Sequence, residues 1–133
     1  MSRFRQRYGP WAVVAGASEG LGAAFAEALA ARGLDLILVA RRAQPLTALA
    51  DRLPTAAVTV VADLATPEGI EAVAAAADGR EVGLVVANAA YSPIGAFLDL
   101  DPAQTRRALD LNCGMPLALA HRFLPAMAGR GRG

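Results

Sequence analysis

The stretch WAVVAGASEGLG, residues 11–22, decides the fold that we expect for this chain. It begins as a short run that is apolar on both faces, as in a strand buried between two layers, and then enters a glycine-rich turn. Glycines in such a turn let the chain reverse tightly, let the backbone approach a pyrophosphate, and let the following helix pack on the strand. The helix N-terminus then offers unpaired N–H groups and a partial positive charge to phosphates. A strand, a glycine turn and a helix in this order predict a dinucleotide-binding unit, although the same glycines could lie in a generic loop.

The rest of the chain repeats this alternation of apolar runs and helical patterns. Short apolar runs predict strands at residues 11–15, 36–40, 58–61 and 84–87. Helical spacing predicts helices at residues 21–32 and 45–53, a third from Thr66, and a long one over residues 101–127 with a bend near Gly114 and Pro116. Thr66 is a typical N-cap, and Asp101 with Gln104 has the spacing of a capping box. This alternation predicts an α/β fold, a Rossmann-type doubly wound parallel sheet of order 3-2-1-4, in one domain over residues 1–133.

Apolar stripes indicate which helix faces are buried. In the first helix the stripe carries an arginine at its rim and consists of Leu21, Phe25, Ala28, Leu29 and Arg32. In the third helix the stripe consists of Ile70, Val73, Ala74 and Ala77. Residues 129–133, rich in glycine and arginine, are expected to be a flexible loop that leads toward another strand rather than a nucleic-acid tag.

Composition excludes several classes of function. With 55% hydrophobic and 19% charged residues among 133, the chain is expected to fold as one domain rather than to be disordered. A net charge of +1 argues against nucleic acid as a partner. No apolar run reaches the roughly 18 residues of a membrane span, so no membrane partner is expected. Arginines at positions 3, 5 and 7 before the apolar run imitate a secretory signal, but a buried strand explains that run better.

The chain has one cysteine and one histidine. Cys113 allows no internal disulfide, which favours a reducing compartment, and we expect a cytoplasmic protein. We interpret Cys113 as a small packing residue and His121 as a surface or interface residue. One Cys and one His do not make a metal-ligand cluster, so no metal is expected.

The spacing of the glycine-rich turn resembles the short-chain dehydrogenase/reductase family rather than the long dehydrogenases. The turn is G-x-x-x-G-x-G after Ala15, where the family has T-G-x-x-x-G-x-G. Further segments resemble family motifs in the same order along the chain: Asp63-Leu64 after the third strand, Ala87-Asn88-Ala89-Ala90 for N-N-A-G after the fourth, and Asn112 in the long helix. The resemblance extends from about residue 8 to the last residue, which suggests the N-terminal portion of a family member.

The resemblance implies a cofactor-binding role for each matching residue. The residues on the pyrophosphate and adenosine side would be Gly16, Ser18, Glu19, Gly20, Leu21 and Gly22. Asp63 would accept a hydrogen bond from the adenine amino group, with Leu64 beside it through its backbone. Asn88, Ala89 and Ala90 would lie along the cofactor ribose and brace the sheet. Taken singly, Asp63 could equally cap a helix and Asn88 could form a turn.

Charge at the end of the second strand predicts which nicotinamide cofactor binds. NAD sites place an Asp or Glu there to hold the ribose hydroxyls. This chain has Arg41 and Arg42 at that end, and the only acid near the strand in sequence, Asp35, is at its opposite end. A guanidinium pairs with a 2′-phosphate through two charge-assisted hydrogen bonds, so we predict NADP over NAD. The alternative is that the two arginines only solvate a helix start.

The resemblance also implies catalytic residues, of which this chain holds one. Asn112 would be the family's catalytic asparagine, which holds a water in the proton relay. A serine and a Y-x-x-x-K motif complete the family's site, but all 13 basic residues here are arginine, and neither Tyr8 nor Tyr91 begins that motif. The chain stops at Gly133, where a fifth strand is expected to begin, so strand four should be an open edge that further polypeptide or a partner covers. We expect the chain to be inactive by itself.

Two functions from different classes remain. The first is an NADP-dependent carbonyl reductase or alcohol dehydrogenase, a homo-oligomer acting on a small-molecule carbonyl or alcohol, of which this chain is the cofactor-binding half. The second is a non-catalytic dinucleotide-binding or protein-interaction module. Ala15, Ala87 and Ala90 replace the family's threonine, asparagine and glycine, and these departures favour an unusual or inactive member. A coding sequence that continues into the serine and Y-x-x-x-K would favour the first function, and a stop codon after Gly133 the second.

Overall fold

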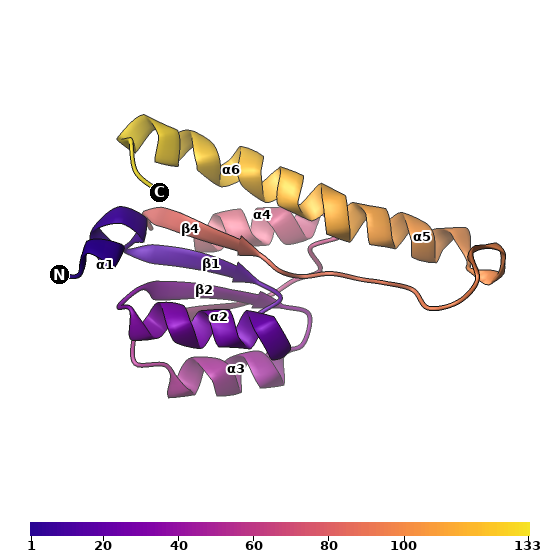
Figure 1. The fold of residues 1–133 in the computed structure, drawn as a ribbon, viewed down its shortest axis with the longest axis horizontal. Helices are drawn as coiled ribbons and strands as arrows, with labels where there is room; N and C mark the ends of the chain where they lie inside the picture. Colours follow the sequence, from indigo (N-terminus) through magenta and orange to yellow (C-terminus); the bar gives the residue numbers. More distant parts are fainter.

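A computed structural model describes all 133 residues, which form a parallel sheet with helices on both faces (Figure 1). The strands are β1 (Trp11–Ala15), β2 (Asp35–Ala40), β3 (Ala57–Val61) and β4 (Val82–Ala87). They pair in the order β3-β2-β1-β4, and every pair is parallel. The predicted sheet order is therefore confirmed, and each strand lies where its apolar run predicted it.

Helices connect the strands as the alternation of patterns predicted. They are α2 (Gly20–Ala31), α3 (Ala43–Arg52), α4 (Pro67–Ala76), α5 (Pro102–Leu109) and α6 (Met115–Arg130). The N-cap hydroxyl of Thr66 accepts a hydrogen bond from the Gly69 amide, and both halves of the predicted capping box are present at Asp101 and Gln104. A π-helical turn, Asp110–Gly114, joins α5 to α6 at the predicted bend. The sequence did not predict α1 (Arg3–Tyr8) or the short 3-10 turn Phe97–Asp99.

Successive residues of each central strand face opposite layers, which gives the sheet two cores. Ala12 and Val14 of β1 are fully buried against α2 and α3 on one face. Val13 and Ala15 are fully buried against α4 and α6 on the other face. Figure 1 shows α2 and α3 below the sheet, α6 above it, α4 behind β4, and α5 extending past the carboxyl ends of the strands. Burial on both faces is the reason that no buried position of β1 or β2 carries a polar side chain.

The stripe predicted for the first helix was wrong except at Leu29, because its other members are exposed. The side of α2 that faces the sheet is made of small residues and one leucine: Gly22, Ala26, Leu29 and Ala30. Leu21 is 64% exposed and Phe25 is 40% exposed. Small side chains let α2 lie close to the strands, and this close approach outweighs the burial of the larger residues. The stripe of α4 was predicted correctly, because Val73, Ala74 and Ala77 are buried and Ile70 is half-buried.

Three parts of the structure differ from the sequence interpretation: the edge strand β3, the C-terminal residues and Cys113. Strand β3 forms one edge of the sheet, and its last residue, Val61, is 55% exposed rather than buried. Residues 129–133 are not a free loop, since α6 continues to Arg130 and Arg132 donates a hydrogen bond of 2.9 Å to the Gln6 carbonyl. Cys113 is exposed and does not pack in the core. His121 is exposed, as predicted, and no helix combines the length and apolar character that a membrane crossing needs.

Candidate functional site

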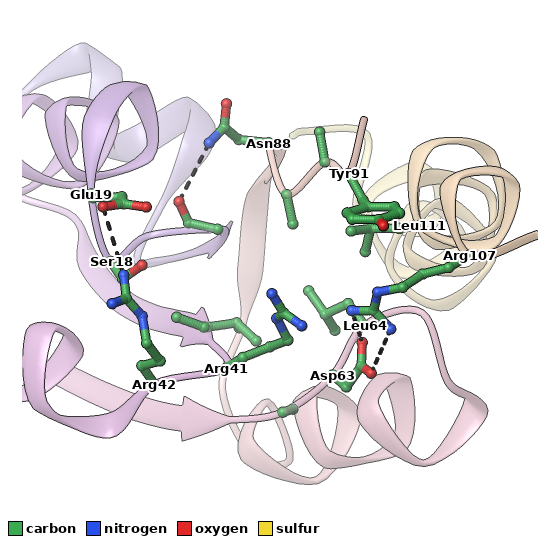
Figure 2. Close-up of a pocket in the computed structure, with 16 residues that line it drawn as sticks. Ser18, Glu19, Arg41, Arg42, Asp63, Leu64, Asn88, Tyr91, Arg107 and Leu111 are labelled. Atoms are coloured by element: carbon green, nitrogen blue, oxygen red, sulfur yellow. Dashed lines mark hydrogen bonds and ion pairs between the residues drawn. The ribbon is translucent and has the colours of Figure 1, made fainter. Parts of the chain in front are cut away.

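A cavity of about 700 Å³ lies at the carboxyl ends of the strands (Figure 2). In an open parallel sheet this is the place where the strand order reverses, here between β1 and β4, and where ligands bind. Most of the predicted cofactor residues line it: Gly16, Ser18, Glu19, Arg41, Arg42, Asp63, Leu64, Asn88, Ala89 and Ala90. The structure does not place Gly20, Leu21, Gly22 or Asn112 in its wall.

The turn from β1 into α2 has the close contacts that require glycine. Gly16 has a φ of +78°, and a Cβ atom there would lie 2.8 Å from the backbone of Ala89. A Cβ atom on Gly22 would lie 1.8 Å from the Gly16 carbonyl oxygen, so only glycine lets α2 start this close to the turn. Glu19, the N-cap residue, gives no side-chain hydrogen bond to the helix. The amide N–H groups of the first turn of α2 therefore remain available to an anion.

Asn88 links the end of β4 to this turn. Its backbone amide donates to the Ala15 carbonyl at 3.2 Å, which extends the pairing of β4 with β1. Its side-chain Nδ2 donates to the Gly16 carbonyl at 3.3 Å. The resemblance implied that Asn88 braces the sheet, and these two bonds do so.

The end of β2 carries both signs of charge. Arg42 Nη2 lies 3.6 Å from Glu19 Oε2, and both side chains are mostly exposed. Arg41 forms no ion pair, and Figure 2 shows its guanidinium pointing into the cavity. The sequence argument counted only Asp35 as a nearby acid and was wrong, because the glycine-rich turn brings Glu19 to the same end of the strand.

The end of β3 carries a second pair of opposite charges. Arg107 Nη1 donates to Asp63 Oδ2 at 2.8 Å, and Arg107 Nη2 donates to Asp63 Oδ1 at 3.0 Å. The hydrogen bond from Arg107 lowers the pKa of the Asp63 carboxyl below its ordinary value, although partial burial opposes the shift. Oδ1 of Asp63 also accepts from the Ala65 amide at 3.1 Å, whereas Thr66 caps α4. Asp63 is therefore part of the local turn and also faces the cavity.

Sequence reasoning missed six residues of the cavity wall, namely Val39, Ala40, Ala62, Tyr91, Arg107 and Leu111. The last two lie four residues apart on the helical segment that carries Asn112, so they share one helix face. Leu111 is buried, and its neighbour one turn earlier lies on the same side of the helix. This spacing could have identified Arg107 from the sequence.

Asn112 lies in the π-helical turn, beside the cavity rather than in its wall. Its Oδ1 accepts a hydrogen bond from the Tyr91 amide at 2.9 Å, and its Nδ2 donates to the Tyr91 carbonyl at 2.8 Å. This double contact fastens the segment after β4 to the long helix. A side-chain amide has two donor and two acceptor positions, so Asn112 keeps one further donor and one further acceptor.

Comparison with known proteins gives one family for almost the whole chain. The sequence model of the family described as short chain dehydrogenase matches residues 10–133. A 7beta-hydroxysteroid dehydrogenase of Collinsella aerofaciens is 32% identical over 133 residues, which cover 97% of this chain and 51% of that protein. The inactive hydroxysteroid dehydrogenase-like protein 1 of Homo sapiens is 32% identical over 135 residues, which cover 96% of this chain and 41% of that protein.

A solved structure is similar over the same range. The short-chain dehydrogenase from Sphingobium yanoikuyae, in complex with NADPH, superimposes with a TM-score of 0.85 at 35% identity. The superposition covers 93% of this chain and 50% of that one. This chain thus spans about half the length, or less, of the relatives that it matches.

Proposed function

The chain belongs to the short-chain dehydrogenase family, and from this premise we propose that it is the cofactor-binding N-terminal half of an NADP-dependent carbonyl reductase or alcohol dehydrogenase. The observation that carries the proposal is the cavity at the carboxyl ends of the strands. There, the residues that lead into the uncapped N-terminus of α2, Gly16, Ser18 and Glu19, line the same space as the unpaired Arg41. The similarity to a short-chain dehydrogenase in complex with NADPH supports the choice of cofactor.

The residues fit a phosphorylated dinucleotide by their chemistry. The N–H groups at the start of α2 would hold the pyrophosphate, beside the turn at Gly16 that lines the cavity. Arg41 would pair with the 2′-phosphate, because it is the one cavity arginine without an anionic partner. Asp63 would accept from the adenine amino group.

The chemical step would be divided between the cofactor and the rest of the protein. The nicotinamide would supply or take the hydride that passes to or from a carbonyl or hydroxyl carbon of a small molecule. Asn112 would use its spare donor and acceptor to hold a water of the proton relay. The family's serine and Y-x-x-x-K are absent from these residues, so this chain should bind the cofactor without turning a substrate over.

The proposal is tested by titrating the chain with NADPH and with NADH, following the binding heat. We expect NADPH to bind about tenfold more tightly or better, since one charge-assisted pair to the 2′-phosphate is worth about 1.5 to 3 kcal/mol. Arg41→Ala should remove most of this preference. The matched control is Arg52→Ala, which removes an exposed arginine that pairs with Glu27 outside the cavity. Equal affinity for the two cofactors would overturn the NADP assignment.

The second candidate is a non-catalytic dinucleotide-binding or interaction module. The similarity to a relative described as inactive favours it. Both candidates predict binding without turnover for these 133 residues, so the mass of the protein isolated from its source separates them. A mass well above 13.7 kDa, with a sequence continuing into the serine and Y-x-x-x-K, supports the enzyme. A mass of 13.7 kDa supports the module.

A further inference from the structure

Arg107 forms two hydrogen bonds with the carboxylate of Asp63 in the wall of the cavity. Its two terminal nitrogens reach the two oxygens of Asp63 at 2.8 and 3.0 Å. The side chains remain 26% and 37% exposed, so the contact forms part of the cavity wall and is open to a ligand (Figure 2). The guanidinium carbon also lies 5.7 Å from the centre of the Tyr91 ring, which limits where Arg107 can move.

The hydrogen bonds of Asp63 leave one position unused. An ionised carboxylate offers about four acceptor positions, two on each oxygen. Oδ1 accepts from Arg107 and from the Ala65 amide, whereas Oδ2 accepts only from Arg107. One acceptor position on Oδ2 is therefore free. A neutral amino group that approaches from the cavity would meet an acceptor held in a single orientation.

Arginine and aspartate in this contact come from elements far apart in sequence. Asp63 follows β3, and Arg107 lies on α5, five residues before Asn112. A planar guanidinium holds a carboxylate at both oxygens, which an ammonium group does not do, so the contact fixes the rotation of the carboxylate as well as its place. The same contact fastens the helix that carries Asn112 to the wall of the cavity.

We propose that Arg107 is a positioning residue for adenine recognition, which holds Asp63 so that Oδ2 accepts from the adenine amino group. This inference rests on the dinucleotide-binding function proposed above. The readout that isolates it is the preference for NADPH over nicotinamide hypoxanthine dinucleotide phosphate, which has a carbonyl oxygen in place of that amino group. An oxygen facing Oδ2 would set two acceptors against each other, so the unmodified chain should prefer NADPH by roughly tenfold.

The experiment measures the affinity of both dinucleotides for the unmodified chain and for three variants. Arg107→Ala should reduce the preference for the adenine form to about one, because the carboxylate can then rotate. Arg107→Lys, which keeps the charge but not the two-point contact, should keep a small part of it. Arg106→Ala is the matched control, since Arg106, the residue before Arg107, pairs with Asp110 four positions further along and does not contact Asp63. It should keep the full preference.

The pH dependence of the preference gives a second readout. The pKa of Asp63 is lowered, chiefly by its hydrogen bond with Arg107, so the carboxylate stays ionised below the ordinary range near 3.9. The adenine preference should therefore be constant above that range in the unmodified chain. Whatever preference the Arg107→Lys variant keeps should be lost over the same range or slightly above it.

Distinct outcomes overturn the inference and the function on which it rests. If the unmodified chain does not bind NADPH, the proposed function fails and the inference fails with it. If the chain binds NADPH but does not distinguish it from the hypoxanthine form, only the inference fails. It also fails if Arg107→Ala weakens both dinucleotides by the same factor, which would indicate a structural role alone. Tighter binding of NADPH by Arg107→Ala would show that Arg107 competes with adenine for Asp63, and would overturn the inference as well.

Discussion

The two ends of the parallel sheet both carry arginines beside acids, yet they use them differently. At the amino end, Arg5 pairs with Asp35 at 3.1 Å and also donates to the Gly33 carbonyl, and Arg132 pairs with Glu81 and donates to the Gln6 carbonyl. These arginines connect separate segments of backbone. At the carboxyl end, the arginines contact only side chains, or nothing, and they face a cavity.

The difference separates a structural use of arginine from a binding use. A guanidinium whose donors reach backbone carbonyls of other elements has little left for a ligand. A guanidinium that contacts one carboxylate, or none, keeps donors free. We therefore expect changes at the amino end to alter stability without altering cofactor affinity, and changes of arginine at the carboxyl end to do the opposite.

A change at Gly22 should have the largest effect, and it should alter both stability and cofactor affinity. Gly22 contributes to the packing of the fold and to the cofactor site. Gly22→Ala would place a Cβ atom 1.8 Å from the Gly16 carbonyl oxygen and 2.9 Å from the side-chain Nδ2 of Asn88. We expect a loss of about 3 kcal/mol in the free energy of unfolding, as for severe overpacking, together with loss of NADPH binding. Chemical denaturation followed by circular dichroism measures the first, and a binding titration measures the second.

The matched control is Gly129→Ala. Gly129 lies in α6, where an added Cβ atom would meet no other atom. Alanine in a helix interior is favoured over glycine, so this variant should gain up to about 1 kcal/mol of stability. A Gly22→Ala variant as stable as the unmodified chain would contradict the packing that we describe for α2.

A change at Arg5, at the amino end of the sheet, should alter stability without altering cofactor affinity. Arg5→Ala would remove hydrogen bonds to Gly33 and Asp35 while leaving the cavity unchanged. We expect a loss of about 1 to 2 kcal/mol in the free energy of unfolding, because Arg5 and Asp35 are only partly exposed and Arg5 bonds a backbone carbonyl as well. Arg3→Ala, on the same helix and exposed, is the control and should change stability little. A change in NADPH affinity for Arg5→Ala, measured where the variant is folded, would contradict the separation of the two ends.

The carboxyl end could be predicted from sequence only in part. The glycine-rich turn and the residues that follow β2, β3 and β4 were identified, because parallel strands bring their carboxyl ends to one edge. Glu19 was placed on the pyrophosphate side, but its proximity to Arg42 was not predicted, since that depends on how the turn folds back over β2. Arg107 was missed because its partner lies 44 positions away in the sequence.

The amino end could not be predicted, for a related reason. Helix α1 is too short to show a clear apolar stripe, and its position depends on contacts that Arg5 and Arg132 make with distant carbonyls. The buried face of α2 was misjudged because apolar periodicity favours large side chains, whereas the contact with the sheet selects small ones. Periodicity thus predicted most of the elements and the buried face of α4, whereas close packing decided the buried face of α2.

A change at Glu19 should have the smallest effect of those considered. Glu19 is an acid at the carboxyl end of the sheet, where we expect the arginines to be free to bind the cofactor. Its carboxylate lies 3.6 Å from Arg42, and both groups are mostly exposed, so the pair contributes little to stability. Glu19→Gln should raise the affinity for NADPH about threefold at low salt by releasing Arg42 and removing a negative charge near the phosphates, and the gain should shrink as ionic strength rises.

The matched control for this change is Glu27→Gln, on the same helix, whose partner Arg52 lies outside the cavity. It should leave the affinity for both cofactors unchanged. If Glu19→Gln instead weakens NADH and leaves NADPH unaltered, Glu19 holds the ribose hydroxyls in the way that an acid at the end of β2 does in NAD sites. The relative affinity for NADH and NADPH would then depend on the pair between Glu19 and Arg42. An acid at the carboxyl end would set this preference together with the arginines.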